Sequence, residues 1–268
     1  MTTELYYLAY GSNLDPERLG RHLAEPTARQ PQWTTIDHGV QFAGNSRRWH
    51  GGVAFLTLTP TGVLHPARLY PMTGTTFAAL FGSENFVGEL PPDPSLLGLQ
   101  PGEWIRMLIP GGAADWRGKY NAILRLDDHA DAPVYAFTTC RDLPPRPPGS
   151  EYLTLIANAR SLAPTGQSPT WQGDPPQTPD PSARRGDAWY GSLAPTDGRG
   201  VTLPAELAPT EPADRARVVD PMTARSREVG LRFEGEQALI GQRDRPSGSD
   251  RLLILIDHRA SSWSGFLF

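Results

Sequence analysis

The sequence predicts a mixed α+β protein with a low helix content. Short runs of apolar and β-branched residues recur along the chain, as at residues 53–58 and 252–256, and such runs are typical of strands. The clearest helical spacing of apolar residues lies at 151–162. The chain holds 28 prolines and 27 glycines, a composition that indicates many turns and few helices.

The N-terminal part alternates between strands and short helices. A strand is expected at residues 4–10, followed by a helix from 15 to about 23 with Pro16 in its first turn. A second helix at 75–80 starts from a threonine cap, and the helix at 151–162 has Ser150 as its predicted N-cap. The other strands of this part are expected at residues 40–43, 53–58, 63–70, 104–109, 122–126 and 134–139.

Composition along the chain predicts two domains. Residues 1–165 carry the elements above and form the first. Residues 166–182 are a predicted linker, because prolines interleaved with Gly, Ser, Thr and Gln cannot bury a core. Residues 183–268 are expected to form a small, mostly-β domain with a modest core, and the sequence does not indicate its role. Its strands are expected at residues 201–203, 229–233, 237–240 and 252–256.

Charge and cysteine content narrow the class of protein. A net charge of −4 and an isoelectric point near 5.9 argue against nucleic-acid binding. The single cysteine, Cys140, excludes an intramolecular disulfide. The first residues lack the features of a signal peptide, and no apolar run approaches transmembrane length. We therefore expect a cytoplasmic protein with neither a nucleic-acid nor a membrane partner; its oligomeric state is not indicated.

The most informative segment is the loop Tyr10-Gly11-Ser12-Asn13-Leu14, which lies between the first strand and the first helix. Consecutive backbone N–H groups at a helix N-terminus can bind an anion. Gly11 allows the backbone to approach a ligand closely, and the short polar residues after it can cap the helix or reach into a pocket. The same composition also suits an ordinary turn.

This loop resembles the signature loop of the γ-glutamylcyclotransferase-like family, also called AIG2-like. Three later stretches are similar to the same family in the same order, namely residues 49–54, residues 80–84 and the helix at 150–160. The resemblance covers residues 4–165. It implies a mixed β-barrel with flanking helices, a small-molecule γ-glutamyl substrate, and no metal or organic cofactor.

The resemblance also implies the roles of individual residues. Glu84 stands in the family's catalytic position, and the loop from Tyr10 to Leu14 would bind the substrate α-carboxylate. In the implied reaction the substrate's own α-amine attacks its γ-carbonyl and releases 5-oxoproline, with Glu84 as general acid and base. Partial desolvation between Phe81 and Phe86 would make this carboxylate a better base near neutral pH.

The sequence departs from the family directly after Glu84. Family members commonly have glycine at the next position, whereas Asn85 follows here. Glu89 is a substitute base if the alignment shifts, and an altered pocket would suit a substrate other than a plain γ-glutamyl amino acid.

Several nearby residues have two interpretations. Arg47 and Arg48 could line the pocket for the leaving group, although a solvated basic turn is the favoured interpretation. The Gly51-Gly52 pair fits close backbone packing or a bulge, and Tyr152 could face the pocket or pack its helix. The six histidines show no metal-ligand spacing, so no metal site is expected.

Two other function classes remain open. The first is a non-catalytic module that uses the Tyr-Gly-Ser-Asn loop to bind a carboxylate ligand. The second is an amide hydrolase or acyl-transfer enzyme on the same fold. Loss of the Glu84 carboxylate discriminates the first from cyclotransfer, and a linear rather than cyclic product discriminates the second.

Overall fold

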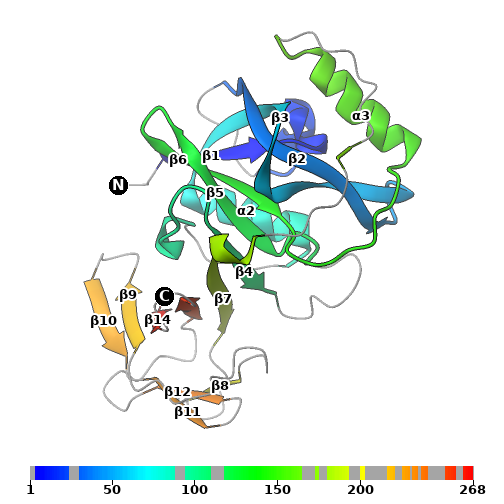
Figure 1. Cartoon of the computed structure of the whole chain (residues 1–268). Helices are drawn as coiled ribbons and strands as arrows, with labels where there is room; N and C mark the ends of the chain where they lie inside the picture. The colour runs from blue at the N-terminus through cyan, green and yellow to red at the C-terminus, as the bar shows by residue number, and fades with distance from the viewer. Residues whose placement is uncertain are drawn as a thin grey trace. The chain divides into compact units, whose positions relative to one another are not determined.

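The computed structural model of the chain divides into two compact units (Figure 1). One holds Met1–Ile105 and Pro110–Arg184, and the other holds Arg106–Ile109 and Arg185–Phe268. The structure describes residues 4–23, 30–87, 94–109, 118–164, 173–174, 180–192, 200–202, 216–220, 225–229, 231–234, 237–240, 251–257 and 262–267.

The first unit is built on a mixed sheet, which confirms the predicted α+β class. β1 (Glu4–Ala9) lies at its centre, antiparallel to β3 and parallel to β6. The strand order is β5-β6-β1-β3-β2, and β4, of which Trp104 and Ile105 belong to this unit, lies next to β5. The other strands have the bounds Gln32–Ser46 (β2), Gly51–Thr73 (β3), Trp104–Leu108 (β4), Ala122–His129 (β5) and Ala132–Thr138 (β6).

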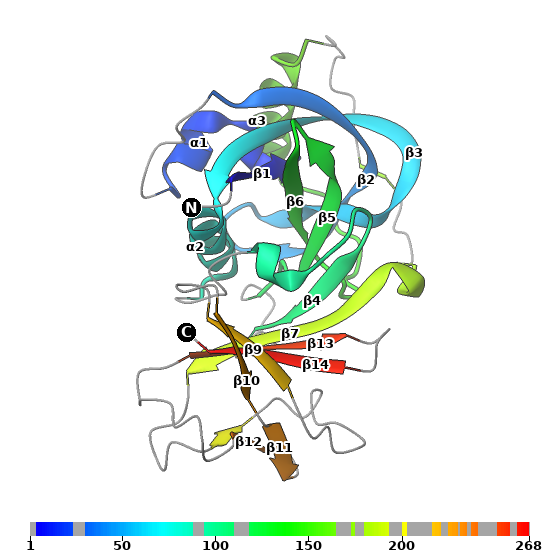
Figure 2. The same cartoon turned by 90° about the vertical axis from the view of Figure 1, so that its left-hand side faces the viewer.

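Strands β2 and β3 form a long bent ribbon that curves past β5 and β6 (Figure 2). The prediction of two separate strands at 53–58 and 63–70 is wrong, because β3 continues through the expected turn. Gly62 takes a positive φ of 76°, and the pairing register shifts on either side of His38 in β2. The turn signal in the sequence therefore marks an irregularity that bends the ribbon rather than an end of the strand.

Three α-helices lie in the described part of the first unit. α1 (Pro16–Gly20) is shorter than predicted, and its N-cap Asp15 accepts a hydrogen bond from the Glu17 N–H. α2 (Gly74–Asn85) starts from the Thr73 cap and runs beyond the predicted end at residue 80. α3 (Ser150–Ser161) is capped by Gly149 in an extended conformation, so Ser150 is not the cap.

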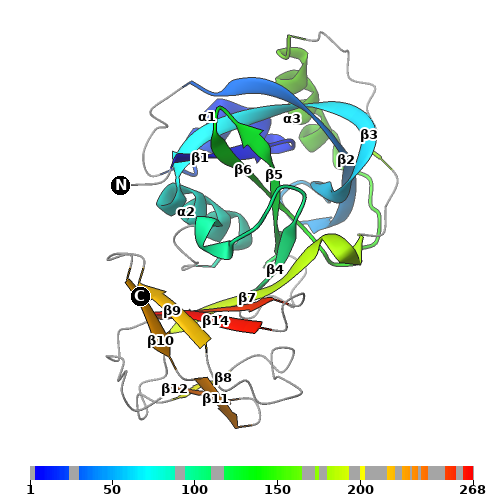
Figure 3. The ribbon, with the colours of Figure 1, turned by 60° about the vertical axis from the view of Figure 1, so that its left-hand side comes forward.

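Helix α2 lies beside β1 (Figure 3) and is fixed to the sheet by aromatic packing. The ring centroid of Phe77 lies 4.6 Å from that of Phe137 in β6 and 6.3 Å from that of Tyr7 in β1. Phe77 and Phe81 are each 1% exposed. Because this face of α2 is buried, the helix holds its last turn beside the end of β1, where the Tyr10–Leu14 loop begins.

The predicted linker falls mostly outside the described residues. At its described residues 173 and 174 it binds β2: the Asp174 N–H donates to the Val40 carbonyl at 2.8 Å, and the Val40 N–H donates to the Asp174 carboxylate at 2.8 Å. His65 lies 2.9 Å from the same carboxylate. This short piece is therefore held against the first unit.

The regular elements described in the second unit are all strands. β12 (Gln237–Ile240) has the predicted bounds and pairs with β11 (Leu231–Glu234) and β8 (Gly200–Thr202). A second group has the order β10-β9-β14-β13-β7; β7, β9, β10 and β14 were not expected from the sequence. The bounds of this group are Arg184–Ser192 (β7), Ala216–Asp220 (β9), Arg225–Val229 (β10), Arg251–Asp257 (β13) and Ser262–Leu267 (β14).

Candidate active site

The Tyr10–Leu14 loop forms a single tight turn after β1. Ser12–Leu14 is a short 3-10 turn, in which the Leu14 N–H donates to the Gly11 carbonyl at 3.0 Å. A Cβ atom on Gly11 would lie 3.2 Å from the side chains of Ala54 and Tyr152, so the absent side chain lets these neighbours pack against the backbone.

Two segments that the sequence analysis singled out meet in the structure. Glu84 lies in the last turn of α2, and the Asn13 side-chain amide donates to its Oε1 at 3.0 Å and to the Tyr7 hydroxyl at 3.2 Å. The Glu84 side chain is 12% exposed. The loop therefore orients the carboxylate through one hydrogen bond between residues 71 positions apart.

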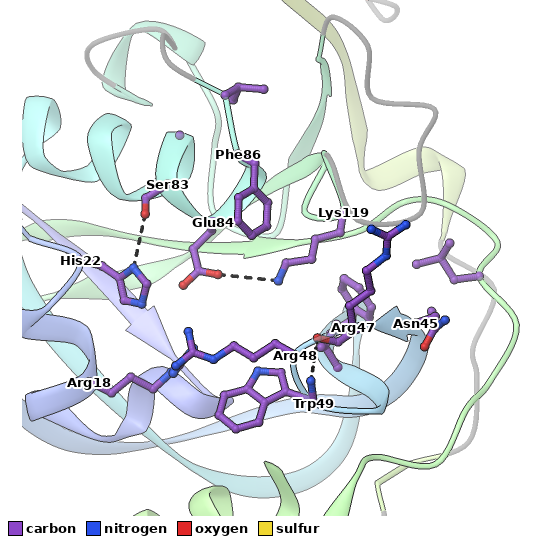
Figure 4. A pocket seen from close by; sticks show the side chains of 17 residues that line it. Arg18, His22, Asn45, Arg47, Arg48, Trp49, Ser83, Glu84, Phe86 and Lys119 are labelled. Carbon is purple, nitrogen blue, oxygen red and sulfur yellow. Dashed lines mark hydrogen bonds and ion pairs between the residues drawn. The ribbon is translucent and has the colours of Figure 1, made fainter. Parts of the chain in front are cut away.

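Lys119 lies on the other side of the carboxylate. Its Nζ is 3.9 Å from Glu84 Oε2 (Figure 4). Burial lowers the pKa of Lys119, and the negative charge of Glu84 opposes that shift. The carboxylate is thus held between an amide donor and an ammonium group.

Hydrogen bonds of Asn85 hold Lys119 next to Glu84. The Asn85 side chain accepts from the Tyr120 N–H at 2.9 Å and donates to the Tyr120 carbonyl at 3.1 Å, while its own carbonyl accepts from the Gly118 N–H at 3.1 Å. Asn85 is fully buried. The residue at which the sequence departs from the family pattern therefore ties the segment carrying Lys119 to the end of α2.

Three buried tyrosines line or support the loop. Tyr7 and Tyr10 are 4% exposed and Tyr152 is 1% exposed. Burial raises the pKa of each, so their hydroxyls stay protonated around neutral pH. The Tyr10 hydroxyl donates to the Phe137 carbonyl at 2.5 Å, and the Tyr152 hydroxyl accepts from the Ala54 N–H at 3.2 Å.

Glu84 stands where two cavities meet, and among the described residues it alone lines both. The inner recess has a volume of about 20 Å³, room for one small polar group. The outer cavity has a volume of about 710 Å³. The inner recess is lined by Tyr7, Tyr10, Gly11, Ser12, Asn13, Ala54, Glu84, Tyr120 and Phe137.

The other predicted or candidate residues fall in different places. Leu14 is fully buried and lines neither cavity, while its carbonyl accepts from Arg68 Nη1 at 2.7 Å. Arg47 and Arg48 are exposed on a turn and also line the outer cavity. Glu89, the substitute base, lies outside the described residues.

Sequence reasoning missed two basic residues of the outer cavity, Arg18 and Lys119. Neither belongs to a motif, and each reaches the cavity only through the fold. In the part of the chain that the structure describes, no cluster of three or more His, Cys, Asp or Glu side chains is arranged to hold a metal ion. No helix in the described ranges has the length and apolar character needed to cross a membrane.

Comparison with known proteins finds a likeness to solved structures. No family model and no curated protein matches the chain. The chain is similar to a solved structure named gamma-glutamyl cyclotransferase, with 15% identity and a TM-score of 0.41 over 64% of this chain and 92% of that one. It is also similar to the crystal structure of an uncharacterized protein from Homo sapiens, with 15% identity, the same coverage and a TM-score of 0.38.

Proposed function

We propose that the protein is a γ-glutamyl cyclotransferase-type enzyme that releases 5-oxoproline from a γ-glutamyl amide. The observation that carries the proposal is the hydrogen bond from Asn13 to Glu84, at the point where the inner recess opens into the outer cavity. One ordered carboxylate beside a small polar recess suits a reaction that needs a single acid/base and a folded substrate.

In this proposal the inner recess receives the polar end of the glutamyl group. Its lining is polar, and the protonated Tyr7 hydroxyl and backbone N–H groups of residues 11–13 would serve as donors to a carboxylate there. With its α-carboxylate held there, the substrate places its α-nitrogen and γ-carbonyl beside Glu84. The amine portion then extends into the outer cavity.

The chemistry begins when Glu84 takes a proton from the α-ammonium group. The freed nitrogen attacks the γ-carbonyl carbon, forming a C–N bond and placing negative charge on the carbonyl oxygen. Lys119, 3.9 Å from the carboxylate, offers a positive charge near that oxygen. The tetrahedral centre collapses as the original C–N bond breaks, and Glu84 returns the proton to the departing nitrogen. Glu84 then takes the remaining extra proton from the ring nitrogen and passes it to the released amine, which leaves as an ammonium. The products are 5-oxoproline and a free amine.

The test is to identify the product formed from a panel of γ-glutamyl amino acids, γ-glutamyl amines and glutathione. Cyclotransfer yields 5-oxoproline in equal amount to the released amine, as measured by NMR or mass spectrometry. Release of free glutamate would replace the proposal with amide hydrolysis. Binding of these compounds without turnover would replace it with a non-catalytic binding module.

A further inference from the structure

The outer cavity has an excess of positive charge. Arg18, Arg47, Arg48 and Lys119 line it, and Glu84 is the carboxylate found among its described lining residues. That carboxylate already faces Lys119 and Asn13. Apart from Glu84, the described residues of the cavity wall include no acidic side chain to balance the guanidinium groups of the three arginines.

Two of these guanidinium groups gather at one aromatic ring. The central carbons of the Arg18 and Arg48 guanidinium groups each lie 5.0 Å from the centroid of the Trp49 ring. Figure 4 shows the two side chains extending toward each other along this ring. Burial lowers the pKa of Arg18, and the charge of Arg48 adds to the shift. Arg18 Nε is also buried without a hydrogen-bond partner, so the pair is arranged to receive an acceptor of negative charge.

The positive charges of the outer cavity also act on His22. Its Nδ1 lies 3.3 Å from the Ser83 hydroxyl. Burial lowers the pKa of His22, and the charges of the neighbouring cations lower it further, against the opposing effect of Glu84. A bound anion would relieve the repulsion among these cations.

Part of the wall of the outer cavity is apolar. Val53, Phe55, Phe86, Val87 and Leu143 line it, so the aliphatic part of a ligand can pack there while its charged ends reach the arginines. A leaving group with one carboxylate would satisfy one guanidinium of the Arg18–Arg48 pair. A leaving group with two carboxylates matches both.

Resting on the cyclotransferase proposal, we propose that the amine released by this enzyme is a dicarboxylic one, as in a γ-glutamyl derivative of an acidic amino acid. Arg18 and Arg48 recognise its carboxylates, the apolar wall holds its methylene groups, and Glu84 acts on the amide that joins it to the glutamyl group.

The experiment compares γ-glutamyl-glutamate with γ-glutamyl-glutamine, which have nearly the same size and differ by one negative charge. The full-length protein is expected to favour γ-glutamyl-glutamate by about 10-fold or more in kcat/KM, the usual value of a hydrogen bond to a charged group. Arg18→Gln and Arg48→Gln should each reduce this ratio. The matched control is Arg21→Gln, because Arg21 is exposed and does not line the cavity. Equal kcat/KM values, or an unchanged ratio in both cavity variants, would overturn the proposal.

A binding measurement separates this inference from the proposed reaction. Calorimetry on the Glu84→Gln protein measures the affinity for both dipeptides without turnover. Tighter binding of γ-glutamyl-glutamate supports the charge recognition even if no 5-oxoproline is formed by the unchanged protein. Equal binding, or no binding, of the two dipeptides overturns it.

Discussion

Among single residues, Asn13 connects the Tyr10–Leu14 loop to Glu84. Its amide donates to Glu84 and to Tyr7, so it fixes the direction of the carboxylate. We expect Asn13→Ala to lower kcat by roughly 10- to 100-fold with a smaller change in KM, because a misplaced base costs rate more than binding. Steady-state kinetics measures both. Asn158→Ala, at an exposed position of α3, is the control; equal losses in the two variants would contradict this role.

The sequence predicts part of this arrangement. The loop and Glu84 could be selected because a family resemblance attaches chemistry to both motifs. Lys119 could not, since it is placed by the hydrogen bonds of Asn85 with a segment 35 residues away. The hydrogen bonds between Asn85, the last residue of α2, and Tyr120 join two distant segments, and such a contact produces no periodic pattern in the sequence.

At the scale of elements, the Gly51-Gly52 pair is explained by close backbone packing. The Gly52 N–H donates to the Pro147 carbonyl at 2.9 Å, and a Cβ atom on Gly52 would overlap the carbonyl of Arg146. We expect Gly52→Ala to lower the free energy of unfolding by about 1–3 kcal/mol, because backbone rather than a flexible side chain must move. Chemical denaturation measures this. Gly20→Ala in α1, with open space around it, should be neutral or stabilising; equal effects would refute the explanation.

The β2–β3 ribbon buries His38, and this burial affects the stability of the folded protein at acidic pH. His38 is 4% exposed, and its Nδ1–H donates to the Thr57 carbonyl at 2.7 Å. Burial lowers the pKa of His38 in the folded state, against the effect of the Thr57 hydrogen bond. Between that lowered value and the unfolded value of about 6.5, the unfolded chain binds more protons, so stability falls as the pH drops.

We therefore expect the Tm of the protein to decrease on acidification from neutral pH through this window, and to decrease less steeply in His38→Gln. Thermal unfolding over a pH series measures the slopes. Replacement of the exposed His50 by Asn is the control and should leave the slope unchanged. A slope unaltered by His38→Gln would show that this histidine does not contribute.

In the same ribbon, the bounds of the strands differ from those predicted from the sequence. Pro60, Thr61 and Gly62 look like a turn, yet the strand continues through them because β2 shifts register opposite. The short predicted strand at 40–43 likewise belongs to a strand that starts at Gln32 and ends at Ser46. Pairing between distant strands, rather than local propensity, sets these bounds.

At the scale of the whole molecule, the second unit draws on two separate stretches of the chain. Arg106–Ile109 group with Arg185–Phe268. Within this unit Arg106 makes two hydrogen bonds to the carboxylate of Asp187, at 2.7 and 3.1 Å, and the Asp187 side chain is 3% exposed. The composition predicts a boundary in the proline-rich stretch at residues 166–182, but it does not reveal that a segment preceding this stretch groups with the later unit.

We expect Arg106→Gln to destabilise the second unit, by up to about 3–5 kcal/mol, because it removes a charged partner of a buried carboxylate. Hydrogen exchange at β7 and β13 should become faster, while exchange in β1 and β6 stays as before. Arg146→Gln, at an exposed position, is the control. Unchanged exchange in β7 would contradict the importance of this pair.

In the proposed reaction, Glu84 performs the acid/base chemistry of 5-oxoproline release. The most direct measurement is the rate of 5-oxoproline formation from γ-glutamyl dipeptides by the unchanged protein and by Glu84→Gln, with Glu151→Gln, exposed in the first turn of α3, as the control. We predict that Glu84→Gln loses about 10²- to 10⁴-fold in kcat while it still binds the dipeptide, and that Glu151→Gln is unaffected. Turnover retained in Glu84→Gln, or no 5-oxoproline from the unchanged protein, would contradict the account.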